Sequence, residues 1–296
     1  MSRRVFLKQV LAAMAGGYLS SIPLSGSAQN KPIIMGVFPR RNTKTTYRMF
    51  WPMAAYLAGE LGIQVKLETE KNFMTFWKNV ENRKYDLVHF NQYHYVVAHK
   101  HFGYNAILMN EEQSRSTISG AIVVRKDSGI KSAMDLKGKT IVFGGGPRAM
   151  QSYIMAKWLL QQDGLTEDMY TTKFARNPPN AIIMTYNKQA DAAGTGDAVL
   201  RMNVVEKNIN TSELEFLALS QPDAHLPWAT SESLSPMLSD QIRNILSELH
   251  TDPFGRHVLK RAELTRLLPA IDSDYDQART IIKDIYGEDL GVNSLK

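Results

Sequence analysis

The sequence of 296 residues contains no cysteine. This absence excludes disulfide bonds, thiol catalysis, thiolate metal sites and an anchor on a lipidated N-terminal cysteine. The chain also lacks a Gly-x-Ser-x-Gly nucleophile motif and a metalloprotease helix. We therefore expect a protein that is not an enzyme and that needs no cofactor.

Long runs of charge of one sign are missing as well. The chain has 35 basic and 29 acidic residues, a formal net charge of +6, and the two kinds are interspersed. A nucleic-acid-binding protein would concentrate its lysines and arginines in a patch or stripe. We expect no nucleic-acid partner. Hydrophobic residues make up 44% of the chain, which is ample for a large core.

The first residues resemble an export signal. Residues 2–8 read Ser-Arg-Arg-Val-Phe-Leu-Lys, as in a twin-arginine signal, and Val10–Ile22 is uncharged and mostly apolar. Small residues at 25–28 suit a signal peptidase, so we predict cleavage after Ala28. The apolar run is too short to favour a membrane span. The alternative is a basic tail that happens to precede a short hydrophobic segment.

The rest of the chain alternates strand and helix patterns, which predicts an α/β fold with a mostly parallel sheet in each of two units. A Pro at position 52 should kink the first helix or mark its true start. After Leu219 the pattern is mostly helical. The expected strands are 33–38, 64–69, 86–90, 106–110, 118–125, 140–143, 170–174, 190–198 and 214–219, and the expected helices are 47–61, 73–82, 94–101, 149–162 and 180–187, with one more from about 235 to 249.

A glycine-rich turn, Gly144-Gly145-Gly146-Pro147-Arg148, lies between an expected strand and an expected helix. Glycines let the main chain approach a ligand, and Pro147 suits the first turn of a helix. Free N–H groups and the helix dipole would attract an anion, and Arg148 would add charge. The alternative is an ordinary tight turn.

Two further segments fall where a ligand crevice is expected. Residues 90–93, Phe-Asn-Gln-Tyr, follow a strand, and the carboxyl ends of strands line the crevice of an open α/β sheet. Residues 177–180 open a helix, with Asn180 as its expected cap; they either cap the helix or also line the cleft.

Four histidines between positions 89 and 101 invite a metal interpretation. Their spacing does not place them on one helix face, where metal ligands usually stand four residues apart. We predict no metal site.

Several segments, in this order, resemble the phosphate, phosphite and phosphonate-binding proteins of ABC transporters. The resemblance covers nearly all of the chain after the signal and depends on the order of its segments, because no single segment is specific. The segments are Gly36-Val37, 57–62 before Val65, 85–87, 123–130, 135–140, 187–193, 255–259 and 274–276.

This resemblance implies a type II periplasmic-binding-protein-like fold, in which two α/β lobes close around a ligand at a hinge. Lobe 1 would comprise residues 31–118 and 222–296, and lobe 2 residues 119–221. The family's Ser-Thr-Ser-Gly cluster is replaced here by residues 147–152, so a larger or more apolar ligand is an alternative to a phosphonate. With the crevice segments above, the predicted ligand contacts are Phe73, Phe90, Asn91, Tyr93, Gly146, Arg148, Ala149, Gln151, Ser152, Asn177 and Asn180.

The resemblance also implies a function. We expect a monomeric periplasmic protein that delivers a small ligand, an oxyanion of the phosphonate or phosphate kind, to an ABC permease. One alternative is a sensory partner that presents the same ligand to a membrane kinase. A second is a secreted enzyme on the same scaffold, which would need a catalytic set that the sequence does not show.

Overall fold

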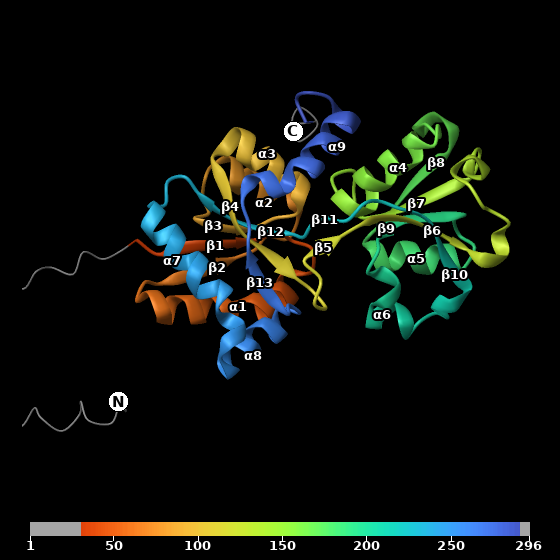
Figure 1. Cartoon of the computed structure of the whole chain (residues 1–296). Helices are drawn as coiled ribbons and strands as arrows, with labels where there is room; N and C mark the ends of the chain where they lie inside the picture. The colour runs from red at the N-terminus through yellow and green to blue at the C-terminus, as the bar shows by residue number, and fades with distance from the viewer. Residues whose placement is uncertain (1–30, 291–296) are drawn as a thin grey trace, which may run out of the picture. The chain divides into compact units, whose positions relative to one another are not determined.

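The structure, a computed structural model, describes residues 31–290, which belong to one compact unit. The predicted export signal, residues 1–28, lies outside the described residues. The described chain alternates strands and helices as expected, and it forms two large sheets and a small one (Figure 1).

The first sheet has six strands in the order β13-β4-β12-β3-β1-β2. The pairs β1–β2 and β1–β3 are parallel, whereas β12 runs antiparallel to both β3 and β4, and β13 runs antiparallel to β4. The strands are β1 (Ile33–Val37), β2 (Val65–Glu68), β3 (Leu87–His89), β4 (Tyr104–Glu111), β12 (Pro227–Ser231) and β13 (Arg266–Pro269).

The second sheet has five strands in the order β10-β6-β9-β7-β8. β7 is parallel to β8 and β9, while β6 is antiparallel to β9 and β10. The strands are β6 (Gly120–Arg125), β7 (Thr140–Gly144), β8 (Thr171–Ala175), β9 (Ala192–Gly196) and β10 (Leu214–Leu219).

The prediction of mostly parallel sheets was therefore wrong, since both large sheets are mixed. In the first sheet the prediction missed β12 and β13, which both lie where the sequence analysis expected a mostly helical region. The five residues of β12 are all buried, and they enter the first sheet between β3 and β4 after the chain returns from the second sheet. Because the chain comes back from the second sheet, β12 runs in the direction opposite to β3 and β4 and pairs antiparallel with both.

The first helix begins earlier than predicted. Asn42 caps it by accepting a hydrogen bond from the N–H of Thr45, and Pro52 lies inside it, not at its start. Other helices begin close to the expected positions. The α-helices are α1 (Thr43–Leu61), α2 (Phe73–Glu81), α3 (Gln92–Phe102), α4 (Ala156–Gln162), α5 (Pro178–Tyr186), α6 (Asn203–Glu206), α7 (Pro236–Ser247), α8 (Pro253–Arg261) and α9 (Asp276–Tyr286). Short 3-10 helices span Lys126–Ser128, Ala133–Leu136, Glu167–Met169, Val199–Arg201, Thr211–Glu213, Leu249–Thr251 and Asp272–Tyr275.

The helix after the glycine-rich turn differs from the prediction in its start and in its type. Its first six residues, Met150–Met155, form a π-helix that continues into α4. Pro147 therefore precedes the helix and does not form its first turn. Single π-helical turns are rare and occur often at functional sites, where they shift the side chains of a helix out of their usual register.

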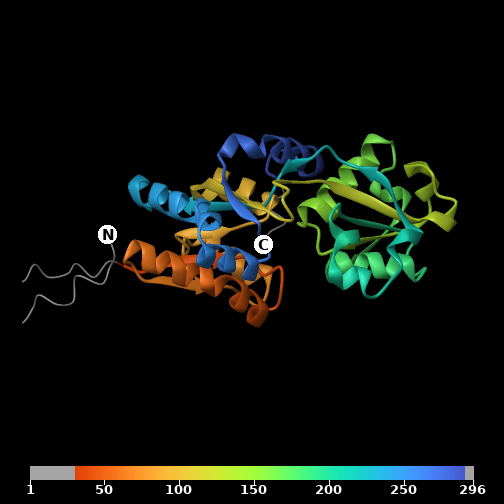
Figure 2. The same cartoon turned by 60° about the horizontal axis from the view of Figure 1, so that its bottom comes forward.

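Two chain segments connect the large sheets. They contain β5 (Thr117–Ile118) and β11 (Asp223–Ala224), which pair antiparallel. Figure 2 shows these yellow and teal segments side by side between the two sheets. This pair is where we predicted a hinge between residues 31–118 with 222–296 and residues 119–221.

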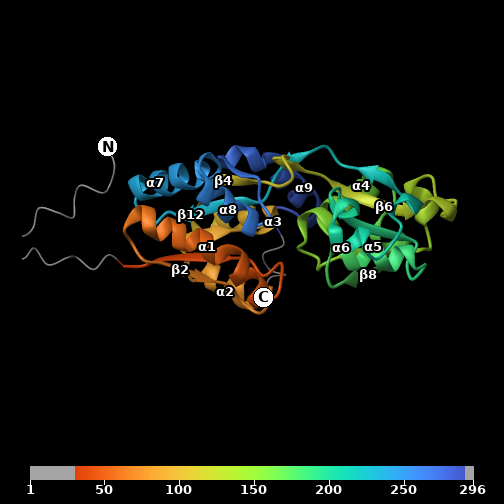
Figure 3. The ribbon, with the colours of Figure 1, turned by 90° about the horizontal axis from the view of Figure 1, so that it is seen from below.

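The C-terminal helix α9 packs against elements of both large sheets. It contacts α3 on one side and α4 with its preceding π-helix on the other (Figures 1 and 3). Ala278, Ile281 and Ile282 of α9 are buried in the same hydrophobic cluster as Met155 and Leu160. Two side-chain hydrogen bonds support this packing, because Trp158 donates to Asp284 over 3.1 Å and Tyr286 donates to the carbonyl oxygen of Pro147.

Candidate functional site

A cavity of about 370 Å³ lies between residues of the first and the second sheet. The first sheet contributes the ends of β1 and β3, and the second sheet contributes the loops after β7, β8 and β9. Both connecting segments border the cavity as well, through Thr117, Ile118, His225 and Leu226. Drug-sized ligands occupy pockets of about 300–1,000 Å³, so this cavity is large enough for a small organic molecule.

Most of the predicted ligand contacts line this cavity. On the side of the first sheet these are Phe73, at the start of α2, and Asn91, after β3. The lining residues on the side of the second sheet, from the loops after β7 and β8, are Gly146, Arg148, Ala149, Gln151, Ser152 and Asn177.

Three predicted contacts do not line the cavity. Phe90 is fully buried in the core, where its ring packs on those of Phe76 and Tyr104. Tyr93 is fully buried too, and its hydroxyl donates to the carbonyl oxygen of Leu290. Asn180 is exposed on α5. Side chains of successive residues point to opposite sides at the end of β3. The side chain of Asn91 therefore faces the cavity, and that of Phe90 faces the core.

The cap of α5 is Asn177 and not Asn180. The side-chain oxygen of Asn177 accepts from the N–H of Asn180 over 3.0 Å, and Pro178 occupies the first helical position. Asn177 therefore combines both roles that the sequence left open, since it caps the helix and also lines the cavity.

The glycine-rich loop is held from several sides. The side-chain amide of Asn91 donates to the carbonyl oxygen of Arg148 over 3.2 Å, and the hydroxyl of Ser152 donates to that of Gly144. Gly145 has a φ of +106°, which favours glycine, and its N–H donates to the carbonyl oxygen of Ala175 over 2.9 Å. Because Gly144 to Gly146 carry no side chains, they line the cavity with main chain.

The charged side chains around the cavity are mainly positive. Five arginines and two carboxylates line it. Glu112 accepts from Arg40 over 3.5 Å, and Asp197 pairs with Arg115 over 2.6 Å. Burial raises the pKa of Glu112, but Arg40 and His225 lower it more, so the net effect is a lowered pKa and a charged carboxylate. The other three arginines of the lining are Arg148, Arg176 and Arg201.

Two buried histidines of the lining are neutral. Burial lowers the pKa of His94 to about 3 and that of His225 to about 4. Nδ1 of His225 accepts from the N–H of Leu226 over 2.8 Å, so Nε2 carries the proton. Nδ1 of His94 lies 2.8 Å from the side-chain oxygen of Asn91, an acceptor, so Nδ1 carries the proton there.

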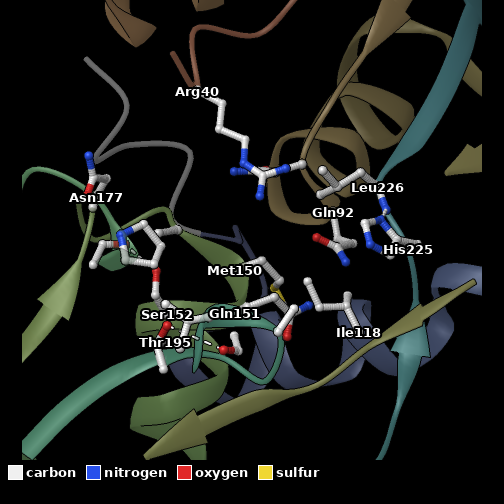
Figure 4. A pocket seen from close by; sticks show the side chains of 18 of the residues that line it. Arg40, Gln92, Ile118, Met150, Gln151, Ser152, Asn177, Thr195, His225 and Leu226 are labelled. Atoms are coloured by element: carbon white, nitrogen blue, oxygen red, sulfur yellow. Dashed lines mark hydrogen bonds between the residues drawn. The ribbon is translucent and has the colours of Figure 1, made fainter. Parts of the chain in front are cut away.

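Two glutamine side chains of the lining have unpaired polar atoms. The oxygen of Gln92 and both amide atoms of Gln151 are buried without a hydrogen-bond partner among residues 31–290. Gln92 begins α3 and Gln151 belongs to the π-helix, so the two come from opposite sides of the cavity (Figure 4). Most buried polar atoms in proteins are paired, so these atoms mark positions for groups of a ligand or for water.

Several lining residues were not among the predicted contacts, namely Arg40, Gln92, Arg115, Thr195, Asp197 and His225. Gln92 belongs to the segment 90–93, which the sequence analysis placed at the crevice without naming Gln92 as a contact. Arg40 follows the first strand, so the rule that strand ends line the crevice applies to it as well. The others lie beside the connecting segments, within β9 or directly after it, and their positions depend on how the chain passes between the sheets.

A search of residues 31–290 finds no group of three or more His, Asp or Glu side chains with the geometry of a metal site. In the same range, no helix combines the length and the apolar character that a membrane crossing requires.

Comparison with known families agrees with this architecture. Residues 35–275 match the family model described as "ABC transporter, phosphonate, periplasmic substrate-binding protein". The chain belongs to this family. As a member of the phosphonate-binding family, it is a periplasmic substrate-binding component of an ABC transporter, which confirms the predicted resemblance and the predicted fold class.

Solved structures with the same fold include members of the phosphonate-binding family. PhnD1 from Prochlorococcus marinus, in complex with methylphosphonate, is 18% identical with a TM-score of 0.74, over 87% of this chain and 99% of that one. A binding protein of an ABC phosphonate transporter from Pseudomonas aeruginosa is 14% identical with a TM-score of 0.71, over 87% and 89%. A Xanthomonas citri protein bound to ATP is 14% identical with a TM-score of 0.72, over 89% and 98%.

Proposed function

We propose that the cavity binds an organic oxyanion, a phosphonate or a phosphate ester, for delivery to an ABC permease. The observation that supports this most directly is the excess of five arginines over two carboxylates in the lining. A charge-assisted hydrogen bond from a guanidinium to a phosphonate oxygen is about twice as strong as a neutral one. The glycine-rich loop adds main chain that a small anionic group can approach closely.

The size of the cavity supports a ligand with an organic substituent. Methylphosphonate has five non-hydrogen atoms, whereas a cavity of about 370 Å³ falls in the range of pockets for drug-sized molecules. Apolar side chains stand beside the charged ones, among them Ile118, Met150 and Leu226. These surfaces suit a carbon skeleton, and a phosphate or sulfate ion would leave them without a partner.

We further propose that the ligand is held by closure of two lobes, residues 31–118 with 222–296 and residues 119–221. The two large sheets and the paired β5 and β11 between them support this division. A ligand that contacts both lobes binds the closed state more tightly than the open one, and this difference shifts the equilibrium toward closure.

A thermal-shift experiment tests the proposed ligand class. Butylphosphonate, methylphosphonate, phosphate, sulfate and an uncharged alcohol are added to the chain without its first 28 residues. At a concentration of 100 Kd a ligand stabilises by about 2.7 kcal/mol, which raises the Tm of a protein of this size by roughly 5 °C or more. We expect a rise with butylphosphonate and none with the alcohol. No rise with any phosphonate would contradict the proposal.

The twin-arginine route is a proposal as well, supported by Arg3, Arg4 and the apolar segment after them. Replacing both arginines by lysine keeps the charge and removes the recognised pair. We expect the variant to remain in the cytoplasm, where fractionation and immunoblotting detect it with an uncut signal. Normal export of the double variant would show that the signal follows another route.

Membrane pull-down with the ligand-loaded protein tests the partner, which we propose to be an ABC permease. Recovery of the permease would support transport. Recovery of a membrane kinase without a permease would favour the sensory alternative. Size-exclusion chromatography with light scattering tests the proposed monomer in the same preparation.

A further inference from the structure

The side chain of Gln92 is held in one orientation. Gln92 is the first residue of α3 and follows the cap residue Asn91, and its side chain is fully buried. Its Nε2 atom donates a hydrogen bond to the carbonyl oxygen of Ala224 over 2.9 Å. A carbonyl oxygen accepts but never donates, so the amide nitrogen must face Ala224 and the amide oxygen must face away from it.

The amide oxygen of Gln92 points into the cavity. Figure 4 shows it directed toward the space between Arg40 and Met150. It is buried and has no hydrogen-bond donor within the described part of the chain. Ile118, Met150 and Leu226 surround this part of the cavity, and their side chains offer no N–H or O–H group. Arg40 and His225 carry N–H groups on this side of the cavity, but neither donates to the oxygen of Gln92. Within the described residues, this oxygen is therefore a fixed acceptor without a donor.

The head group of an oxyanion does not suit this position. Phosphonate oxygens are acceptors and repel another acceptor, so the head belongs near the arginines and the glycine-rich loop. A cationic group would lie within a cavity whose lining already has an excess of positive charge. The group that fits the oxygen of Gln92 is an uncharged N–H or O–H donor.

Gln151 adds a second polar contact from the opposite side. Its side chain is only 9% exposed, and both its amide nitrogen and its amide oxygen lack partners in the described chain. It can therefore donate to and accept from the same polar group. A hydroxyl or an amide on the ligand has both functions, whereas an alkyl chain has neither.

From these contacts we infer that Gln92 selects ligands that carry an uncharged N–H or O–H donor on the organic part, away from the anionic head. This inference rests on the proposed function and narrows its substrate class. An alkyl ligand of the same shape would leave the oxygen of Gln92 buried and unpaired, and sites built for a hydrogen bond reject analogues that lack it.

Isothermal titration calorimetry with matched phosphonates tests the inference. The pairs are 2-hydroxyethyl- and propylphosphonate, 3-hydroxypropyl- and butylphosphonate, and 4-hydroxybutyl- and pentylphosphonate. Each pair has equal numbers of non-hydrogen atoms and differs only in a hydroxyl against a methyl group. We expect the hydroxyl member of at least one pair to bind about tenfold or more tightly than its alkyl partner.

The variant Gln92→Met keeps the length of the side chain and removes its acceptor. We expect this variant to lose the preference for the hydroxyl member within each pair, because neither member can then donate to a side-chain oxygen at position 92. Gln162→Met, an exposed position on α4, is the matched control and should keep the preference.

The outcomes separate the inference from the proposed function. If no phosphonate binds, the proposed function fails and the inference fails with it. If both members of every pair bind equally, or if Gln92→Met keeps the preference, the inference alone is wrong. Should Gln92→Met fail to fold, as its melting curve would show, the comparison of the pairs in the unaltered protein still decides.

Discussion

The two sides of the cavity are built from different parts of the chain. On the side of the first sheet, side chains form the surface, as with Arg40, Phe73 and Gln92. On the side of the second sheet, Gly144 at the end of β7 and Gly145 and Gly146 after it line the cavity with main chain, beside side chains such as that of Gln151. We call the surface on the first sheet the side-chain wall and these three glycines the main-chain wall.

The difference determines what a substitution does on each side. A side chain of the first wall can be exchanged without moving the backbone, so its loss changes affinity and leaves the fold intact. The three glycines of the main-chain wall have no side chain to remove, and they can be changed only by adding atoms to a packed loop. Overpacking of this kind affects stability and binding together.

The largest expected effect comes from giving the main-chain wall a side chain. A Cβ atom at Gly144 would lie 2.3 Å from the Cα atom of Pro178, and this neighbour is backbone that cannot turn away. We expect Gly144→Ala to lower the free energy of unfolding by about 3 kcal/mol and to weaken ligand binding. Urea unfolding and calorimetry measure the two effects.

Gly146→Ala is the control for this experiment, because a Cβ atom there meets nothing within 4 Å. We expect its stability to stay within about 0.5 kcal/mol of the original. Equal destabilisation by both changes would show that the loop does not pack as described.

The next largest effect concerns the side-chain wall. Arg40→Met keeps most of the apolar stem and removes the guanidinium that pairs with Glu112. We expect affinity for a phosphonate to fall about thirtyfold, or about 2 kcal/mol, because a charge-assisted hydrogen bond is lost. Arg243→Met on α7, which is not in the lining, should leave affinity unchanged. A loss of stability without a loss of affinity would contradict the role of this wall.

A third, smaller effect concerns how stability depends on pH, through a residue of one segment that connects the two large sheets. Asp223 of β11 is 3% exposed, and burial raises its pKa to about 6 from 3.8. Above pH 6 the folded protein holds a buried charge that the unfolded chain exposes to water, so the folded state loses stability as the pH rises from about 4 to 6. We expect Asp223→Asn to raise the free energy of unfolding by about 1.5 kcal/mol at pH 7.5.

That gain should vanish near pH 4, where Asp223 is protonated in the folded protein. His225 changes the stability with the opposite pH dependence, because burial lowers its pKa to about 4 from 6.5. Below pH 6.5 only the unfolded chain takes up this proton, so the contribution of His225 is lost as the pH falls toward 4. Stability measured from pH 7.5 to 4 should therefore fall more steeply in Asp223→Asn than in the unaltered protein. Parallel curves would contradict the assignment of Asp223.

The smallest expected effect is at α9. Trp158→Phe keeps most of the ring and removes the N–H that donates to Asp284 over 3.1 Å. Because this hydrogen bond is exposed, we expect a loss of only about 0.5 kcal/mol in unfolding free energy. Hydrogen exchange should increase in α9 and leave the central strands unaffected. Increased exchange throughout the second sheet would mean that Trp158 supports more than this contact.

The sequence predicted the elements that follow regular patterns. A continuous apolar run located β1, and the alternation of strand and helix patterns located most of the other elements before Leu219. β12 was missed because it is short and begins with a proline, Pro227, and because its pairing requires the chain to return from the second sheet. No local signal in the sequence reports such a return.

The site residues divide in the same way, into those that a local pattern predicts and those that depend on the path of the chain. The glycine-rich loop and Asn91 were found from strand ends, and the structure places them at the cavity. Phe90 was assigned to the site by the same strand-end rule and by the resemblance, but side chains alternate along a strand, and the choice between Phe90 and Asn91 depends on which one faces the core. Arg115, Asp197 and His225 were out of reach because two separate crossings of the chain bring them together.

Helix α9 is a third link between the two halves of the molecule, beside the two strands that connect them. Any movement of one half against the other must stretch, slide or break the contacts that Asp284 and Tyr286 of α9 make with Trp158 and with the carbonyl oxygen of Pro147. A fluorophore attached along the outer face of this helix would lie beside contacts that such a movement changes. The natural chain thus offers a ready position for an optical sensor of whatever solute it carries.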